Sequence, residues 1–232
     1  MNLYDYIWKR KSTRNYNVLA LSEEELNRIL EYAKELKPLY PNIKVDYQIT
    51  TAAKKSLLAK APYYLMISSE EKEGYLENVG FMFQQIDLYL SSQGYGSCWQ
   101  GMAKPLAELK SEFPFVIAIA FGNVDNPYRN QSEFERKPLS SISSGTDERL
   151  DAARVAPSAV NNQNWFFVAN NNEIDVFRKK GPISVFDRTN KIDVGIAICH
   201  LFIASEHMGK PFSFVSETDR TKKGYIYVGT VK

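Results

Sequence analysis

The feature that most constrains this chain is a helical pattern that occurs twice. Residues 79–94 and residues 194–209 both read Val-Gly, then thirteen residues, then Gly, and Gly195 follows Gly80 by 115 residues, about half of the 232-residue chain. Both stretches are small or apolar on nearly every side, which is typical of a helix buried in a core. The pattern predicts two related halves, although two unrelated buried helices that each end in a glycine cap would look the same.

The elements around these two helices recur in one order. Ser22 and Glu25 predict a capping box at the start of an amphipathic helix, and residues 146–155 predict a similar helix in the second half. Each of these helices is followed by two strand-like runs, and a third strand follows each buried helix. The predicted strands are residues 45–49, 63–67 and 115–122, and then residues 165–168, 173–177 and 225–229.

This mixture of helices and an inferred mixed sheet predicts an α+β fold. We expect residues 1–125 to form the first half and residues 146–232 the second, joined by a polar connector over residues 126–145. Lys and Arg number 29 against 27 Asp and Glu, a net charge of +2. So small an excess gives no broad positive field, which argues against a dedicated nucleic-acid binder.

The cysteines and the N-terminal residues bear on the compartment. Cys98 and Cys199 lie far apart and outside any CxxC pattern, as expected in a reducing environment. The first ten residues contain an acid and no apolar core of a signal peptide, and no segment reaches 18 uninterrupted apolar residues. These observations predict a cytoplasmic protein with no membrane partner.

The densest local chemistry is the run Arg10-Lys11-Ser12-Thr13-Arg14, which follows a short apolar helix. Guanidinium groups match phosphate oxygens in a bidentate manner, and a hydroxyl adds a further donor. The run therefore favours a phosphate site. Short basic runs of this kind are also common on solvated surfaces and at helix C-termini.

A second segment, residues 156–165, joins a helix to a strand. Its proline ends the helix, and small and amide side chains follow. Small residues allow a flat aromatic ligand to lie against the backbone, while Ser, Asn and Gln supply donors and acceptors for the edge of a heterocycle. The same residue types also form ordinary turns.

Other candidates are less specific. Residues 94–101 contain three glycines after the first buried helix and predict a loop that allows close backbone approach. Lys54 lies in a helix predicted over residues 53–61. His200 falls within the second buried helix, where a hydrogen-bonded core histidine is the default, and neither it nor His207 accompanies an obvious nucleophile or metal cluster.

Taken together, four motifs resemble the FMN-dependent nitroreductase family over nearly the whole chain. They are Arg10, Ser12 and Arg14 in this spacing, Pro157-Ser158 with Asn161, Gln163 and Trp165, residues 94–101, and Arg136-Lys137-Pro138. The resemblance implies a nitroreductase-like fold. In the usual family member, however, the Pro-Ser segment follows the Arg-x-Ser-x-Arg segment within a few dozen residues, whereas here residues 35–41 occupy that place and lack the motif.

This departure and the repeat explain one another. Members of the family are homodimers with FMN at the subunit interface, so a chain of two fused halves needs to keep only one side of one site in each half. The chain resembles the single-chain, pseudo-dimeric branch of the family. That implies one FMN per chain and a monomer that acts as a fused pseudo-dimer. Asn164 replaces the usual proline before Trp165.

The resemblance also implies which residues contact the cofactor. Arg10, Lys11, Ser12 and Arg14, with Arg136 and Lys137, would lie at the phosphate and ribityl end. Pro157, Ser158, Ala159 and Asn161 would pack on the isoalloxazine from the other half, and Trp99, Gln100 and Gly101 would lie near flavin N5 and O4. A cation at Lys54 would stabilise the reduced flavin at its pyrimidine edge, and a solvated surface position is the other interpretation of that residue.

The implied activity is oxidoreduction by two alternating half-reactions. NAD(P)H would reduce the flavin, and the flavin would then reduce a small electrophilic acceptor such as a nitroaromatic or a quinone. The family chemistry requires no protein nucleophile and no metal. Because Arg10 is assigned to the phosphate and not to the core, we expect Arg10→Ala to weaken FMN binding and leave the fold intact. The alternative is a flavin-binding storage or sensing protein without efficient turnover, and a third possibility keeps the fold without the flavin.

Overall fold

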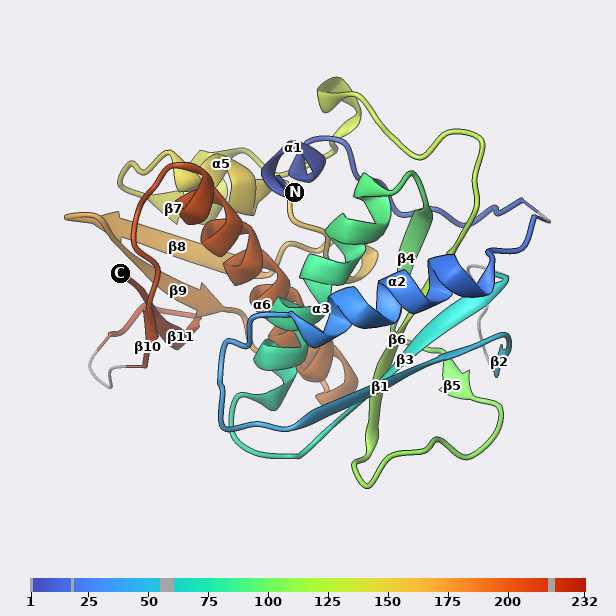
Figure 1. Cartoon of the computed structure of the whole chain (residues 1–232). Helices are drawn as coiled ribbons and strands as arrows, with labels where there is room; N and C mark the ends of the chain where they lie inside the picture. Colours follow the sequence, from blue (N-terminus) through green and yellow to red (C-terminus); the bar gives the residue numbers. More distant parts are fainter. Residues whose placement is uncertain (1, 18, 55–60, 217–219) are drawn as a thin grey trace.

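The computed structural model describes residues 2–17, 19–54, 61–216 and 220–232. Its two main sheets share one strand order, and together they flank a central pair of helices (Figure 1). In the first half the elements are α1 (Tyr4–Ile7), α2 (Glu23–Lys34), β1 (Val45–Thr50), β2 (Ala53–Lys54), β3 (Tyr63–Ser69), α3 (Tyr75–Ser92), β4 (Gly96–Gln100), β5 (Lys104–Pro105) and β6 (Phe115–Gly122).

The connector and second half contain the remaining elements. They are the 3-10 helix η1 (Gln131–Glu133), α4 (Leu139–Ile142), β7 (Ser143–Ser144), α5 (Arg149–Arg154), the 3-10 helix η2 (Ala159–Asn161), β8 (Trp165–Asn170), β9 (Glu173–Arg178), α6 (Ser184–His207), β10 (Phe214–Val215) and β11 (Ile226–Val231).

The first sheet has the order β1-β3-β6-β4 and is antiparallel throughout. The second sheet contains β8-β9-β11-β10, again with every neighbour antiparallel, and adds β7 from the connector as a parallel edge strand beside β8. Each position in the first order is matched by the strand at the same place in the second. The predicted α+β fold is confirmed, and both halves use one topology.

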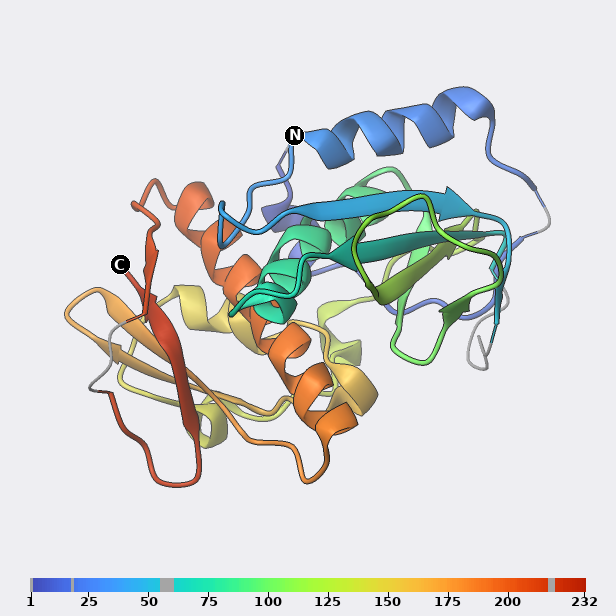
Figure 2. The same ribbon diagram turned by 90° about the horizontal axis from the view of Figure 1, so that it is seen from below.

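The helices α3 and α6 pack against each other between the sheets, which lie on opposite sides of this pair (Figure 2). A Cβ atom at Gly80 would overlap the carbonyl oxygen of Ile192, and one at Gly195 would overlap that of Glu77. Ile192 follows Glu77 by the same 115 residues that separate the two glycines. The contact is therefore reciprocal, as across a twofold axis.

The two central helices also end alike. Gly94 and Gly209 have positive φ angles of 80° and 64°, which suit glycine because it has no Cβ. Beyond them, the Tyr95 N–H donates to the Leu90 carbonyl and the Lys210 N–H donates to the Ser205 carbonyl, both at 2.9 Å. This bond pattern is the Schellman cap.

Three local predictions need correction. Residues 94–101 were predicted as a loop, but β4 occupies most of the segment because Cys98 and its neighbours pair with β6. Ala53–Lys54 forms a short strand with β5 instead of opening a helix, and residues 55–60 lie outside the described residues. The helix predicted over residues 146–155 begins at Arg149, whose N–H donates to Asp147 Oδ1 at 2.9 Å, and its N-cap residue Glu148 makes no side-chain cap. The Ser22–Glu25 capping box is confirmed.

Candidate functional site

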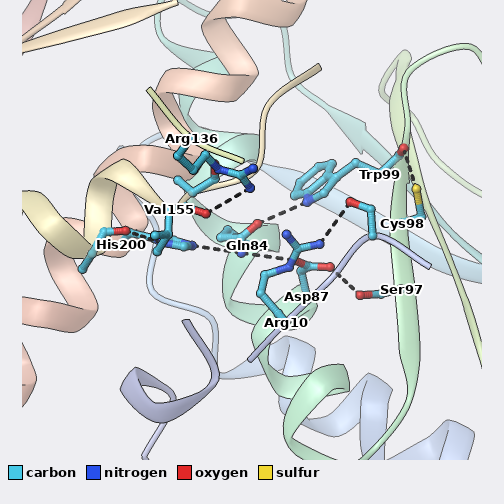
Figure 3. A network of polar contacts seen from close by, with 12 residues as sticks. Arg10, Gln84, Asp87, Ser97, Cys98, Trp99, Arg136, Val155 and His200 are labelled. Atoms are coloured by element: carbon cyan, nitrogen blue, oxygen red, sulfur yellow. Dashed lines mark hydrogen bonds and ion pairs between the residues drawn. The ribbon is translucent and has the colours of Figure 1, made fainter. Parts of the chain in front are cut away.

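A buried polar network lies where the two halves meet, and Asp87 is its centre (Figure 3). This residue lies on α3 and is fully buried. Its carboxylate forms an ion pair with Arg10, whose Nε lies 2.7 Å away, and accepts hydrogen bonds from Ser97 Oγ at 2.5 Å and from Gln84 Nε2 at 3.1 Å. The donors come from the segment after α1, from β4 and from α3, so one carboxylate ties three elements together.

Arg10 is a core residue, which corrects the expectation that its removal would leave the fold intact. Its exposed fraction is 1%, and a buried ion pair that loses one partner leaves an uncompensated charge behind. Arg10 Nη2 also donates to Ser12 Oγ at 3.3 Å. The third nitrogen, Nη1, is buried and has no hydrogen-bond partner among the described residues. A buried guanidinium nitrogen without an acceptor is costly unless a ligand supplies one.

Gln84 links this cluster to the second half. Trp99 Nε1 donates to its amide oxygen at 3.2 Å, and its amide nitrogen lies 3.2 Å from His200 Nε2. His200 Nδ1 lies 2.8 Å from the Ala152 carbonyl, so Nδ1 carries the proton and Nε2 accepts from Gln84. Burial lowers the pKa of His200 to about 3. The prediction of a hydrogen-bonded core histidine is confirmed.

The segment after α5 is hydrogen-bonded to Asp193 of α6. Both carboxyl oxygens of Asp193 accept from the Ala159 N–H, at 3.0 and 3.1 Å, and burial raises the pKa of this carboxyl to about 8. Ser158 Oγ accepts from the Gln163 N–H at 2.9 Å. Val160, with φ 46°, is 80% exposed, although β-branched residues rarely adopt positive φ. Unusual backbone of this kind is typical of functional sites.

The connector is fastened to this segment. Arg136 donates from Nε to the Ala156 carbonyl at 3.2 Å, from Nη2 to the Val155 carbonyl at 3.2 Å, and from Nη1 to Asn161 Oδ1 at 2.9 Å. The Lys137 N–H donates to Gln163 Oε1 at 2.7 Å. The structure thus brings together Arg136, Lys137 and the candidate residues 157–161.

Arg10, in the network around Asp87, and Arg136, in the connector, bring their guanidinium groups to the same region. In Figure 3 the guanidinium groups of Arg10 and Arg136 point toward one another beside Trp99. Burial and the charge of Arg10 lower the pKa of Arg136 to about 10, which still leaves it protonated at neutral pH. Two like charges close together raise the local positive potential, which favours an anion.

The edge of the first sheet continues away from this point. β4 is an edge strand, and Thr13 N–H donates to the Ser97 carbonyl at its start. Trp99 and Gly101 follow along the same edge, which extends about 13 Å from Ser97 to Gly101 at the usual rise of a strand. Edge strands present backbone N–H and C=O groups to a ligand. Gly101 faces Thr189 of α6, in the second half.

Three predicted residues are not seen in these clusters. Arg14 is exposed, and its charge acts on Tyr16 and Cys98. Lys11 follows Arg10 and is half-buried. Lys54 is exposed on β2, opposite Lys104 of β5.

Sequence reasoning missed Gln84, Asp87 and Arg129. The first two had a signal, because polar side chains in an otherwise apolar buried helix need partners. Arg129 had none, since it is one cation in a polar connector. Its guanidinium lies 4.7 Å from the centroid of the Phe134 ring, and burial and the charge of Arg10 lower its pKa to about 10.

In the described residues, no group of three or more His, Cys, Asp and Glu side chains could hold a metal ion. Within the same part of the chain, no helix has the length and apolar character required to cross a bilayer.

Known proteins share this architecture. Among solved structures, the chain is similar to a protein from Thermotoga maritima described as a "putative nitroreductase", with 21% identity, a TM-score of 0.68, and coverage of 100% of this chain and 92% of that one. It is also similar to a nitroreductase family protein from Clostridium difficile 630, with 18% identity, a TM-score of 0.51, and coverage of 63% of this chain and 99% of that one. No curated protein matches the sequence.

The family model agrees with the fold. The model described as "Putative TM nitroreductase" matches residues 2–205, which is most of the chain. The match includes the buried network around Asp87, the connector, and the segment after α5, whose Ala159 N–H donates to Asp193. The chain therefore belongs to this nitroreductase family.

Proposed function

We propose that the chain binds FMN where its two halves meet and acts as an NAD(P)H-dependent oxidoreductase on a small electrophilic acceptor, such as a nitroaromatic or a quinone. One observation carries the proposal: Arg10 Nη1 is buried without an acceptor while the Arg136 guanidinium faces it. A phosphate ester would supply the missing acceptor oxygens. The donor set therefore fits the phosphate end of FMN.

The remaining candidates fit the rest of the cofactor. Ser12 and Lys11 adjoin Arg10 at the ribityl end. The small side chains of Pro157, Ser158 and Ala159 offer a flat surface from the second half, and Asp193 fixes the Ala159 N–H so that the backbone there keeps one conformation. Residues 99–101 offer backbone groups from the first half. Arg14 and Lys54 remain proposals as cofactor contacts.

FMN would supply hydride transfer at N5, first from NAD(P)H and then to the acceptor. The protein's part is binding, orientation and electrostatics. The hydrogen bond from Trp99 to Gln84 fixes the orientation of the Trp99 indole ring, which would form one wall of the site beside Arg10 and Arg136. The buried network from His200 to Asp87 fixes the Arg10 guanidinium before any ligand arrives, which lowers the ordering cost of binding.

We also propose that the chain is a fused pseudo-dimer with one FMN per chain. The common strand order and the reciprocal glycine contacts support the fusion. The residues 115 positions after Asp87 and Ser97 are Phe202 and Phe212, whose ring centroids lie 5.1 Å apart in an edge-on contact. An aromatic pair thus replaces the carboxylate and hydroxyl that hold Arg10, so the described part of the second half offers no matching phosphate site at these positions.

The test is the visible spectrum of the purified chain with added FMN, followed by anaerobic stopped-flow mixing with NADH and with NADPH. The proposal expects flavin bands that bleach rapidly with at least one nucleotide and return when a quinone is added. Bound flavin that neither nucleotide bleaches would contradict the enzymatic role and favour storage or sensing. Absence of bound flavin would contradict the cofactor.

The proposed monomer is tested separately by light scattering on the eluted protein. A mass near 26.5 kDa is expected, because the fusion already contains both faces of the interface. A mass of twice that value would contradict the monomer.

A further inference from the structure

The connector contributes a further cation, Arg129, which belongs to none of the sequence motifs. The backbone of Arg129 is paired with the segment that carries Arg10. The Arg129 N–H donates to the Lys9 carbonyl at 2.8 Å, and the preceding Tyr128 pairs with Arg10 in an antiparallel bridge. This pairing carries Arg129 to the side of Arg10. The placement is fixed by backbone bonds and does not depend on a flexible loop.

The side chain of Arg129 is held as well. Its guanidinium carbon lies 4.7 Å from the centroid of the Phe134 ring, and that of Arg136 lies 5.5 Å from the same centroid. One aromatic ring therefore supports both guanidinium groups through cation–π contacts. The charges of Arg10 and Arg136 act in the same neighbourhood, since Arg10 and Arg129 each oppose the protonation of Arg136.

The three guanidinium groups differ in how many of their N–H donors have protein acceptors. Arg136 directs four hydrogen bonds to protein acceptors, at Ala156, Val155, Glu135 and Asn161. Arg129 Nε, in contrast, is buried and has no partner among the described residues, like Nη1 of Arg10. The unmet donors thus belong to Arg10 and Arg129, while Arg136 contributes mainly its charge.

The local charge leads to the same conclusion. Of the three guanidinium groups, Arg10 forms an ion pair with the buried carboxylate of Asp87, so these three arginines and Asp87 together carry an excess of two positive charges. Glu133 and Glu135 lie nearby but are exposed, so solvent screens them. A phosphate monoester carries between −1.5 and −2 charges at pH 7, whereas each phosphate of a diester carries one.

We infer that Arg129 binds the terminal phosphate of the cofactor together with Arg10, and that the three-arginine cluster selects a dianionic phosphate monoester. This inference rests on the proposed function. It assigns to Arg129 the discrimination of FMN from riboflavin, which lacks the phosphate, and from FAD, in which that phosphate is joined to AMP through a pyrophosphate bond and carries a single negative charge.

The experiment compares wild type with Arg129→Gln, Arg129→Lys and the control Arg28→Gln, whose exposed arginine pairs with Glu24 on α2. Affinities for FMN, riboflavin and FAD are measured by titration calorimetry. We expect Arg129→Gln to bind FMN about 10- to 100-fold more weakly, the loss typical of a charge-assisted hydrogen bond, with riboflavin affinity unchanged. Arg129→Lys is intermediate, and Arg28→Gln matches wild type.

Two results would overturn the inference: unchanged FMN affinity in Arg129→Gln, or an equal loss for FMN and riboflavin, which would indicate a structural role. The unliganded Arg129→Gln protein should melt no lower than wild type, because the substitution relieves repulsion from Arg10. If wild type binds no flavin, the proposed function fails, and inorganic phosphate decides the inference. Phosphate must then raise the melting temperature of wild type and not that of Arg129→Gln; equal shifts would refute it.

Discussion

Asp87→Asn is the substitution that tests the buried network most sharply. It keeps the shape of the side chain and removes the carboxylate that faces Arg10 at 2.7 Å, where the two side chains are 0% and 1% exposed. The arginine then stays in the core without a counter-charge. The cost falls on the folded state, because Arg10 is fully hydrated once the chain unfolds.

The expected magnitude follows from this burial. Breaking one side of a buried ion pair costs about 3–5 kcal/mol, and each kcal/mol shifts the melting temperature of a chain of this size by about 2–4 °C. We therefore expect the unliganded variant to melt about 6–20 °C below wild type. Saturating FMN should narrow this gap, because its phosphate would supply negative charge beside Arg10.

The assay is thermal unfolding followed by circular dichroism, with and without FMN. Asp151→Asn is the matched control, since its carboxylate is 59% exposed and lies 3.8 Å from Arg154, a geometry worth about 0–1 kcal/mol. If unliganded Asp87→Asn melts with wild type, the network does not stabilise the fold as argued. If FMN stabilises the variant less than wild type, the phosphate does not lie beside Arg10.

Two further predictions concern α6 and its pseudo-equivalent α3. Gly80→Ala and Gly195→Ala should each lower the free energy of unfolding by about 1–3 kcal/mol, because either new Cβ meets a backbone carbonyl of the facing helix. The control Gly94→Ala should cost only about 1 kcal/mol, for its positive φ. Urea titrations measure these changes, and a large effect at only one of Gly80 and Gly195 would refute the reciprocal packing. Asp193 has a pKa raised to about 8 in the fold, so its contribution to stability is present at low pH and is lost as the pH rises from about 4 toward 8. Asp193→Asn, which copies Asn78 at the equivalent position, should abolish that decline in unfolding titrations at pH 5, 6.5 and 8, and an unchanged decline would contradict it.

The sequence predicts best where the signal is local. The Ser22–Glu25 capping box forms because both partners lie within one turn, and the two glycine caps end the central helices where the repeat places them. The order of the helices and of the three predicted strands in each half is likewise predictable, since each of those strands is a compact run rich in β-branched or aromatic residues.

The rest depends on contacts between distant segments. β4 has the composition of a loop, yet it is a strand because Cys98 lies opposite Ala120 of β6, and Gly96 is required where the backbone packs against Thr13 and Val124. Arg10 was assigned to a phosphate contact and not to the core, but pairing with Asp87 buries it. Arg129 lies beside Arg10 because its backbone N–H donates to the Lys9 carbonyl, a contact between distant segments that no local sequence pattern indicates.

The stoichiometry of FMN binding tests the central claim most directly, because that claim is one site formed jointly by two related halves. Calorimetric titration of the unliganded chain with FMN is predicted to give one bound flavin per chain, and Arg136→Gln, in the connector that is bonded to the second half, should weaken that single event. Two flavins per chain, or none, would contradict the account.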